Sequence, residues 1–272
     1  MQALPQAAFF LLLEAAVGGT IALFWVHLRG EVSRGFTLFT GVCLLVFAVL
    51  AVWLRSAFPP LVSPQIDPSA SLWFAAERAL SFAFVVALAV YLVSLRQAWT
   101  SITRPIGPLV PLLGLASLWA AALVSPSPQL FGLGTPLAVL AGAIALGSAL
   151  AGLSLGHWYL VSPTLSVKPL IQVTFLCLGA VAAQIILLPV LLFASGPSQP
   201  GVQQLFSGYL AFFGVRVVFG LLVPLIATIM TWRTARIRSL DSATGLLYIV
   251  TALILAGEIA ARTLFFLTGV AT

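Results

Sequence analysis

Apolar residues fill eight long segments of this chain, and short polar stretches separate them. Each segment is about as long as the roughly 20 apolar residues that one helix needs to cross a bilayer. The pattern therefore predicts an all-α integral membrane protein with eight transmembrane helices. The expected ranges are about 7–28, 35–54, 72–95, 106–124, 136–161, 168–194, 205–232 and 244–268.

The composition strengthens this prediction. Of the 272 residues, 61% are hydrophobic and only 7% are charged, and the mean hydropathy is +1.17. These values exclude an ordinary soluble domain, and the connections between the apolar segments are too short to hold one. A net charge of +6 can also indicate nucleic-acid binding. Basic loops on one membrane face explain this charge more simply, so no nucleic-acid partner is expected.

The basic residues favour one orientation in the membrane. Basic residues gather in the odd-numbered loops, whereas the even-numbered loops hold only Arg55. The residues of the odd-numbered loops are Arg29, Arg34, Arg96, Arg104, Lys168, Arg233, Arg236 and Arg238. Because positive charge marks cytoplasmic loops, we expect a multi-pass protein of the inner (cytoplasmic) membrane with both termini outside. Residues 1–6 carry no Lys or Arg, so no cleavable signal peptide is expected.

The chain also shows signs of an internal repeat. Three pairs of like residues recur at offsets of 130, 134 and 138 residues, namely His27 with His157, Cys43 with Cys177, and Arg78 with Arg216. Four helices per copy would give both copies the same orientation in the membrane. We therefore expect one membrane domain built from two four-helix bundles, residues 1–125 and residues 126–272.

Ionisable residues inside the apolar segments are the main candidates for function. A charge in hydrocarbon is costly unless it is paired or wetted, so such residues mark functional sites by default. Six charges lie in or at the edge of these segments, all toward the outer side, and Gln184 lies at a similar depth. They are Glu14, Glu77, Arg78, Arg216, Glu258 and Arg262.

Two interpretations of these charges stay open. In the first, they form a buried ion-pair network that fixes helix packing. In the second, they line a polar pocket in which a carboxylate takes protons from a quinol and an Arg or Gln binds a quinone oxygen. The second interpretation assigns Glu258 and Glu14 as catalytic carboxylates. It assigns quinone binding to Arg262, Arg216, Glu77, Arg78 and Gln184.

The histidines and cysteines give a weaker signal. His27 and His157 both lie at cytoplasmic helix ends, where two histidines can ligate one haem b iron. Histidines at the membrane interface are the simpler interpretation. Cys43 and Cys177 belong to no CxxC or Cys/His cluster, so we expect buried structural thiols and no metal within this chain.

The last apolar segment reads LAGEIAARTLFFLTG, from Leu255 to Gly269. It resembles the last helix of the dimethyl sulfoxide reductase membrane-anchor family, and more distantly the polysulfide-reductase-type membrane subunits. The first segment, LLLEAAVGGTIAL, is similar in style to the first helix of that family. The segment GHWYLVSPTLS has no counterpart there. The resemblance supports a role for Glu258, Arg262 and Glu14.

The resemblance implies a quinone-interacting membrane anchor of a respiratory oxidoreductase. Such a subunit would bind menaquinone or ubiquinone and pass electrons between quinol and a partner iron–sulfur subunit. Its expected partners are the iron–sulfur and catalytic subunits and membrane lipid. Two alternatives remain: a haem b protein ligated by His27 and His157, and a small-solute transporter lined by the outer charges.

Overall fold

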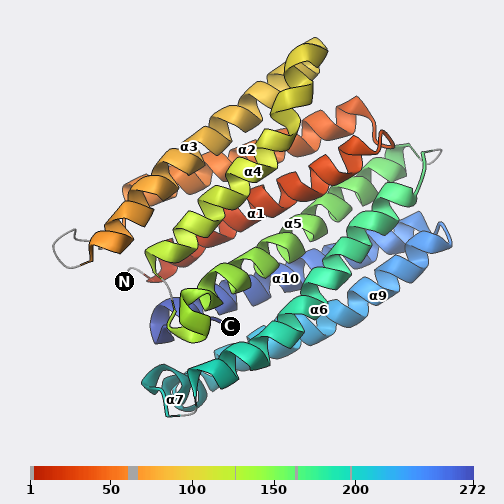
Figure 1. Ribbon diagram of the computed structural model, residues 1–272. Coiled ribbons are helices and arrows are strands. Elements are labelled where there is room, and N and C mark those ends of the chain that lie inside the picture. The colour runs from red at the N-terminus through yellow and green to blue at the C-terminus, as the bar shows by residue number, and fades with distance from the viewer. Residues whose placement is uncertain (1–2, 61–66, 126, 163–164, 197) are drawn as a thin grey trace.

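The computed structural model describes residues 3–60, 67–125, 127–162, 165–196 and 198–272. Within these residues, eight helical segments are long and apolar enough to cross a membrane, as predicted. They run side by side in one elongated bundle, and both chain ends lie at the same end of it (Figure 1). The eight segments are α1 (Ala3–Leu28), α2 (Arg34–Ala57), α3 (Pro68–Gln97), α4 (Thr100–Val124), α5 (Gly134–Val161), α6 (Lys168–Ser195), the composite span Leu210–Arg236 and α10 (Leu240–Thr268).

Helices α1 and α5 form the centre of the bundle and join the two halves of the chain. They are the most buried spans, at 72% and 61% of their apolar windows. Gly18 of α1 faces Gly147 and Ala143 of α5, and a Cβ on either glycine would overlap the backbone of the other helix. Small residues are what allow two membrane helices to approach so closely. The fold therefore depends on glycine at this crossing.

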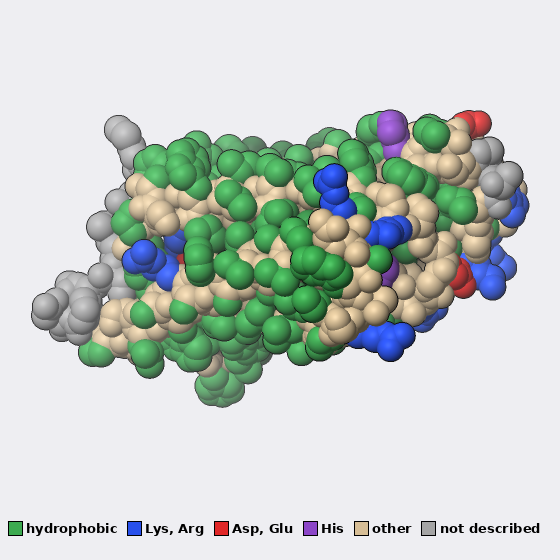
Figure 2. Space-filling view, turned by 90° about the horizontal axis from the view of Figure 1, so that it is seen from above, with side chains coloured by type: hydrophobic (Ala, Val, Ile, Leu, Met, Phe, Trp, Pro, Cys, Tyr) green, Lys and Arg blue, Asp and Glu red, His purple; other side chains and the backbone are tan. Residues whose placement is uncertain are grey.

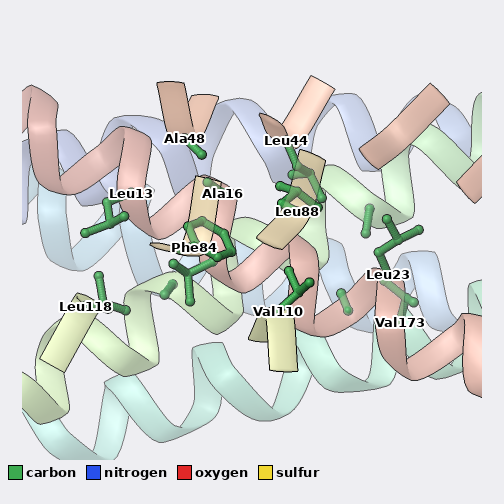
Figure 3. Packing of buried hydrophobic residues seen from close by; sticks show 14 of the residues in the cluster. Leu13, Ala16, Leu23, Leu44, Ala48, Phe84, Leu88, Val110, Leu118 and Val173 are labelled. Atoms are coloured by element: carbon green, nitrogen blue, oxygen red, sulfur yellow. The ribbon is translucent and has the colours of Figure 1, made fainter. Parts of the chain in front are cut away.

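Apolar side chains from several helices interlock around α1. Figure 3 shows side chains of α1, α2, α3, α4 and α6 converging on one core. The labelled members include Leu13, Leu23, Leu44, Phe84, Leu118 and Val173. Because lipid tails are as apolar as leucine, van der Waals packing and polar contacts must hold these helices together. The buried polar clusters described below therefore matter for the fold as well as for chemistry.

Two spans differ from the ranges that the sequence predicted. Helix α4 begins at Thr100, several residues earlier than expected, and keeps three prolines inside it. The seventh span is composite. It consists of α8 (Leu210–Gly214), the π-helical segment η2 (Val215–Leu222) and α9 (Val223–Arg236), and the short α7 (Pro200–Ser207) precedes it. The π-helical turns end just before Pro224, which cannot donate a backbone hydrogen bond.

The surface agrees with a membrane-embedded bundle. Apolar side chains cover the long flank in Figure 2, whereas most Lys and Arg side chains gather at the end that also carries histidine. The two histidines lie near the ends of α1 and α5, away from the chain termini. The molecule thus has a basic end and an opposite end that holds both termini. These features together indicate a multi-pass membrane protein.

Candidate functional sites

The structure divides the predicted polar residues between two separate clusters. The central cluster consists of Glu14, Gln184, Arg216, Glu258 and Arg262, from α1, α6, η2 and α10. The groove cluster consists of Gln6, Arg55, Glu77, Arg78 and Ser81, from α1, α2 and α3. Both lie toward the end of the bundle that holds the chain termini. The sequence predicted a single site, and the contacts between side chains form two.

In the central cluster, Glu258 binds two arginines at once. Arg216 Nη1 donates to Glu258 Oε1 at 3.1 Å, and Arg262 Nη2 donates to Glu258 Oε2 at 3.1 Å. Arg262 Nη2 also donates to the Ala138 carbonyl at 3.1 Å. Arg216 Nη2 donates to Gln184 Oε1 at 2.5 Å. One carboxylate thus holds η2 and α10 together, with α5 and α6 attached through the remaining donors.

Glu14 completes the charge balance of the central cluster. Arg262 Nε lies 2.7 Å from Glu14 Oε1, but its N–H does not point at that oxygen. The contact is therefore an ion pair without a directed hydrogen bond. Neither oxygen of Glu14 has a hydrogen-bond donor among the described residues. Two carboxylates and two guanidinium groups give the cluster no net formal charge.

The central cluster is closed to ligands. Glu14 is 0% exposed, and Arg216, Glu258 and Arg262 are at most 2% exposed. The cavity described beside Arg216 has a volume of about 10 Å³, which is too small for anything larger than one water molecule. A Cβ on Gly142 would overlap Glu258 and Arg262. The cluster fills its space, as a packing element does.

In the groove cluster, Arg55 and Glu77 form a bidentate pair. Arg55 Nε donates to Glu77 Oε1 at 2.7 Å, and Arg55 Nη2 donates to Glu77 Oε2 at 2.5 Å. Arg55 also donates to Gln6 Oε1, and Gln6 Nε2 donates to the Phe58 carbonyl at 2.9 Å. The Arg55 guanidinium carbon lies 4.3 Å from the centre of the Phe9 ring. This geometry fixes the plane of the Arg55 guanidinium group, which supplies the counter-charge of Glu77.

A cavity of about 520 Å³ opens between α2 and α3 above this pair. Arg55 and Glu77 lie at its floor with Ser81, whose buried Oγ has no hydrogen-bond partner among the described residues. Arg78 is exposed and lines the same cavity, and its guanidinium carbon lies 5.9 Å from the centre of the Phe74 ring. Phe82, which is 63% exposed, lines the side that faces outward. A ligand of this size can therefore enter from the flank of the bundle.

Four residues of or beside these clusters were not predicted from the sequence, namely Gln6, Arg55, Ser81 and Thr272. Arg55 was counted as a loop charge because it lies one turn from the end of its helix, and Gln6 precedes the predicted first span. Thr272 belongs to the central cluster through its main-chain oxygen, 3.4 Å from Arg216 Nη2. An unpaired Glu77 inside an apolar segment was the one signal that pointed to a missing partner.

The histidines do not share a site. His27 Nδ1 lies 3.5 Å from Thr37 Oγ1, and its ring meets the Tyr91 ring edge to face at 6.1 Å. His157 Nδ1 lies 3.1 Å from the Tyr248 hydroxyl. The described residues contain no group of three or more His, Cys, Asp or Glu that could hold a metal ion.

The thiols are free, and only one of them is buried. Cys177 is buried, but Cys43 on α2 is exposed, contrary to the prediction of two buried thiols.

Comparison with models of known protein families and with curated proteins gives no match to this chain.

Proposed function

We propose that this protein is a quinone-interacting membrane subunit and that the quinol head group binds in the cavity between α2 and α3. The observation that carries this proposal is the cavity itself. It has a volume of about 520 Å³, lies open to the flank, and combines apolar side chains with a carboxylate, two guanidinium groups and two serine hydroxyls. Ligand cavities typically measure about 300–1,000 Å³ and combine apolar walls with a few polar groups.

The chemistry of the cavity suits a quinol. Phe9, Val52 and Phe82 provide apolar surface for the ring and the isoprenoid chain. Ser81 and Arg55 can donate hydrogen bonds to a quinone oxygen, and Glu77 can accept a proton from a quinol hydroxyl. Oxidation of one quinol releases two protons and two electrons. The electrons would pass to the iron–sulfur cluster of a partner subunit, and the protons would leave through Glu77 toward the end that holds the termini.

The central cluster has a different role in this proposal. Glu14 and Glu258, the carboxylates first assigned to catalysis, lie where a quinol has no space. Glu77 and Arg78, first assigned only to binding, lie at the cavity. In this proposal, quinol is oxidised at the groove cluster. The central cluster is an ion-pair network that fixes helix packing.

Quinol turnover tests this proposal directly. The complex that contains this chain should be isolated from native membranes, and its iron–sulfur reduction by a short-chain quinol measured. Arg78→Gln should raise the KM for quinol with little effect on stability, because Arg78 is exposed at the cavity edge. Arg104→Gln, at the basic end, is the matched control. The proposal would be contradicted if Arg78→Gln and Arg104→Gln had the same KM for quinol and Glu77→Gln had the turnover of the native protein.

The orientation and the internal repeat belong to the same proposal. The asymmetry of basic loops supports a location in the inner membrane with the groove cluster facing outward. The packing supports the repeat: α1 contacts α2 and α4 as α5 contacts α6 and α10, and α3 pairs with α4 as α9 pairs with α10. A periplasm-active reporter fused after Thr272 should be active, and one fused near Arg236 should be silent.

The haem and transporter alternatives are less well supported. Haem ligation by His27 and His157 would require both rings to face one iron, but each ring has a different aromatic neighbour. A stoichiometric b-type band in a reduced-minus-oxidised spectrum, lost in both single His→Ala variants, would restore that alternative. A transporter would need a path for the solute between the outer charges. The charged side chains of the central cluster are almost fully buried, and the described cavity beside Arg216 is too small for a solute.

A further inference from the structure

A second cavity lies at the opposite end of the bundle from the groove cluster. Its volume is about 310 Å³, and α2, α5 and α10 form its walls. The lining residues come from the first half of α2, the last half of α5 and the first half of α10. This cavity therefore shares no lining residue with the cavity between α2 and α3, and it lies near the basic end.

Several hydroxyl and other polar groups line this cavity. Thr40 is 2% exposed, and its Oγ1 has no hydrogen-bond partner among the described residues. Tyr248 meets His157 through its hydroxyl at 3.1 Å, with the two rings edge to face. Ser154 and Cys43 complete the polar set. Because buried hydroxyl groups are nearly always hydrogen-bonded, the free Thr40 hydroxyl points to an absent acceptor.

The remaining walls determine what kind of molecule fits. They are Phe and Leu side chains, and the described lining contains no Asp, Glu, Lys or Arg. Phe39 is 59% exposed and Tyr248 is 50% exposed, so the cavity is reached from the surrounding lipid. An ionised head group would find no Asp, Glu, Lys or Arg here as a counter-charge and would lose its hydration. The cavity lining therefore favours a ligand with an uncharged head group and an apolar chain.

We propose that this cavity binds a lipophilic molecule whose head carries a carbonyl oxygen, with the Thr40 hydroxyl as the hydrogen-bond donor. Two membrane components share this chemistry: an isoprenoid quinone, and the acyl ester of a membrane lipid. The inference does not rest on the proposed function of the groove cluster. Either ligand would occupy a site at the opposite membrane face.

Photolabelling of the purified full chain tests the site. A short-chain quinone that carries an aryl azide is added in detergent micelles, irradiated, and located by peptide mass spectrometry. Label is expected on peptides of α2 around Phe39–Phe47 or of α5 around Leu150–His157. Competition by an unlabelled short-chain quinone or by a diacylglycerol distinguishes the two sources, and success of either competitor supports the site.

Matched variants make the test specific. Thr40→Val keeps the side-chain volume but removes the donor, so the competitor concentration for half-protection should rise about 2- to 10-fold. Thr174→Val is the control, because Thr174 is also buried with an unpartnered hydroxyl but does not line this cavity. Ser154→Leu should fill the cavity and abolish the label.

The outcome can contradict the inference independently of the groove cluster. Label that stays unchanged in both Thr40→Val and Ser154→Leu would overturn it, as would label confined to the last half of α2 and to α3. Glu77→Gln should leave the label at this second cavity unchanged. A failure of quinol turnover in that variant therefore says nothing against the second cavity.

Discussion

The central cluster and the groove cluster contain the same types of side chain but differ in the space beside them. Each contains Arg–Glu pairs that are almost fully buried, and each lies toward the same end of the bundle. The central cluster takes its side chains from four helical segments, packs against α5 and borders a described cavity of about 10 Å³, whereas the groove cluster borders one of about 520 Å³. The comparison shows that buried intramembrane ion pairs occur both with and without a cavity beside them, so charge by itself does not reveal where a ligand has room.

Packing explains why the two regions differ. The central cluster lies beside the closely packed α5, where Gly142 leaves space for the Glu258 and Arg262 side chains and for nothing more. The groove cluster lies beside the cavity that α2 and α3 line together with Phe9 of α1. Small residues, Ala75 and Ala79, line the α3 side of that opening. Helix crossing distance, and not charge, therefore separates a closed network from an accessible one.

Removing one arginine from the central cluster should have the largest effect. Arg262→Met leaves Glu14 without its only ion-pair partner among the described residues. Breaking a buried pair in this way typically costs about 3–5 kcal/mol. Thermal unfolding in detergent should show a large loss of stability. The double variant Arg262→Met with Glu14→Gln should recover part of it, and no recovery would contradict the assigned pairing.

Replacing the carboxylate of each cluster should separate catalysis from stability. Glu77→Gln can still accept a hydrogen bond from Arg55 but cannot take a proton, so quinol turnover should fall by about 100-fold or more. Glu258→Gln should mainly lower stability, because two arginines lose their shared counter-charge. Both variants need activity measured per folded protein. A selective activity loss in Glu258→Gln would reverse the two roles.

Adding one or two methyl groups should distinguish the closely packed central cluster from the cavity beside the groove cluster. Gly142→Ala places a Cβ against Glu258 and Arg262 and should cost about 1–3 kcal/mol through overpacking. Ala79→Val projects into the cavity between α2 and α3, so it should raise the KM for quinol with little change in unfolding temperature. Equal stability losses in the two variants would show that the groove is as tightly packed as the central cluster.

The smallest effect is expected outside the membrane, where α3 begins. Asp67 caps that helix by accepting hydrogen bonds from Ala70 N–H and Ser69 Oγ–H, which hold its pKa below the ordinary value of 3.8. A depressed carboxyl pKa stabilises the folded state above the unfolded pKa, and this contribution is lost as pH falls through the folded pKa. The unfolding temperature of the native protein should therefore decline slightly more below pH 3.8 than that of Asp67→Asn, which lacks this one contribution. Parallel pH profiles would contradict the cap.

The sequence alone determined the number and class of helices. Hydropathy identifies a membrane span because every backbone group in lipid must be satisfied within a helix, whatever its neighbours. The same reasoning marked Glu14, Gln184, Arg216, Glu258 and Arg262 as unusual, and the structure does bring these five together.

Only the tertiary structure decided which charges pair and which border a cavity. Glu77 pairs with Arg55 across two helices, and no local pattern encodes that distance. The close packing of the central cluster depends on Gly142, and the space beside Glu77 depends on how α2 and α3 are placed relative to each other. Periodicity reports which residues meet lipid or protein, but the crossing of helices far apart in the sequence sets the space between them. For that reason the sequence could predict which charged residues lie within membrane spans. Whether they pack closely or border a cavity could be seen only in the three-dimensional structure.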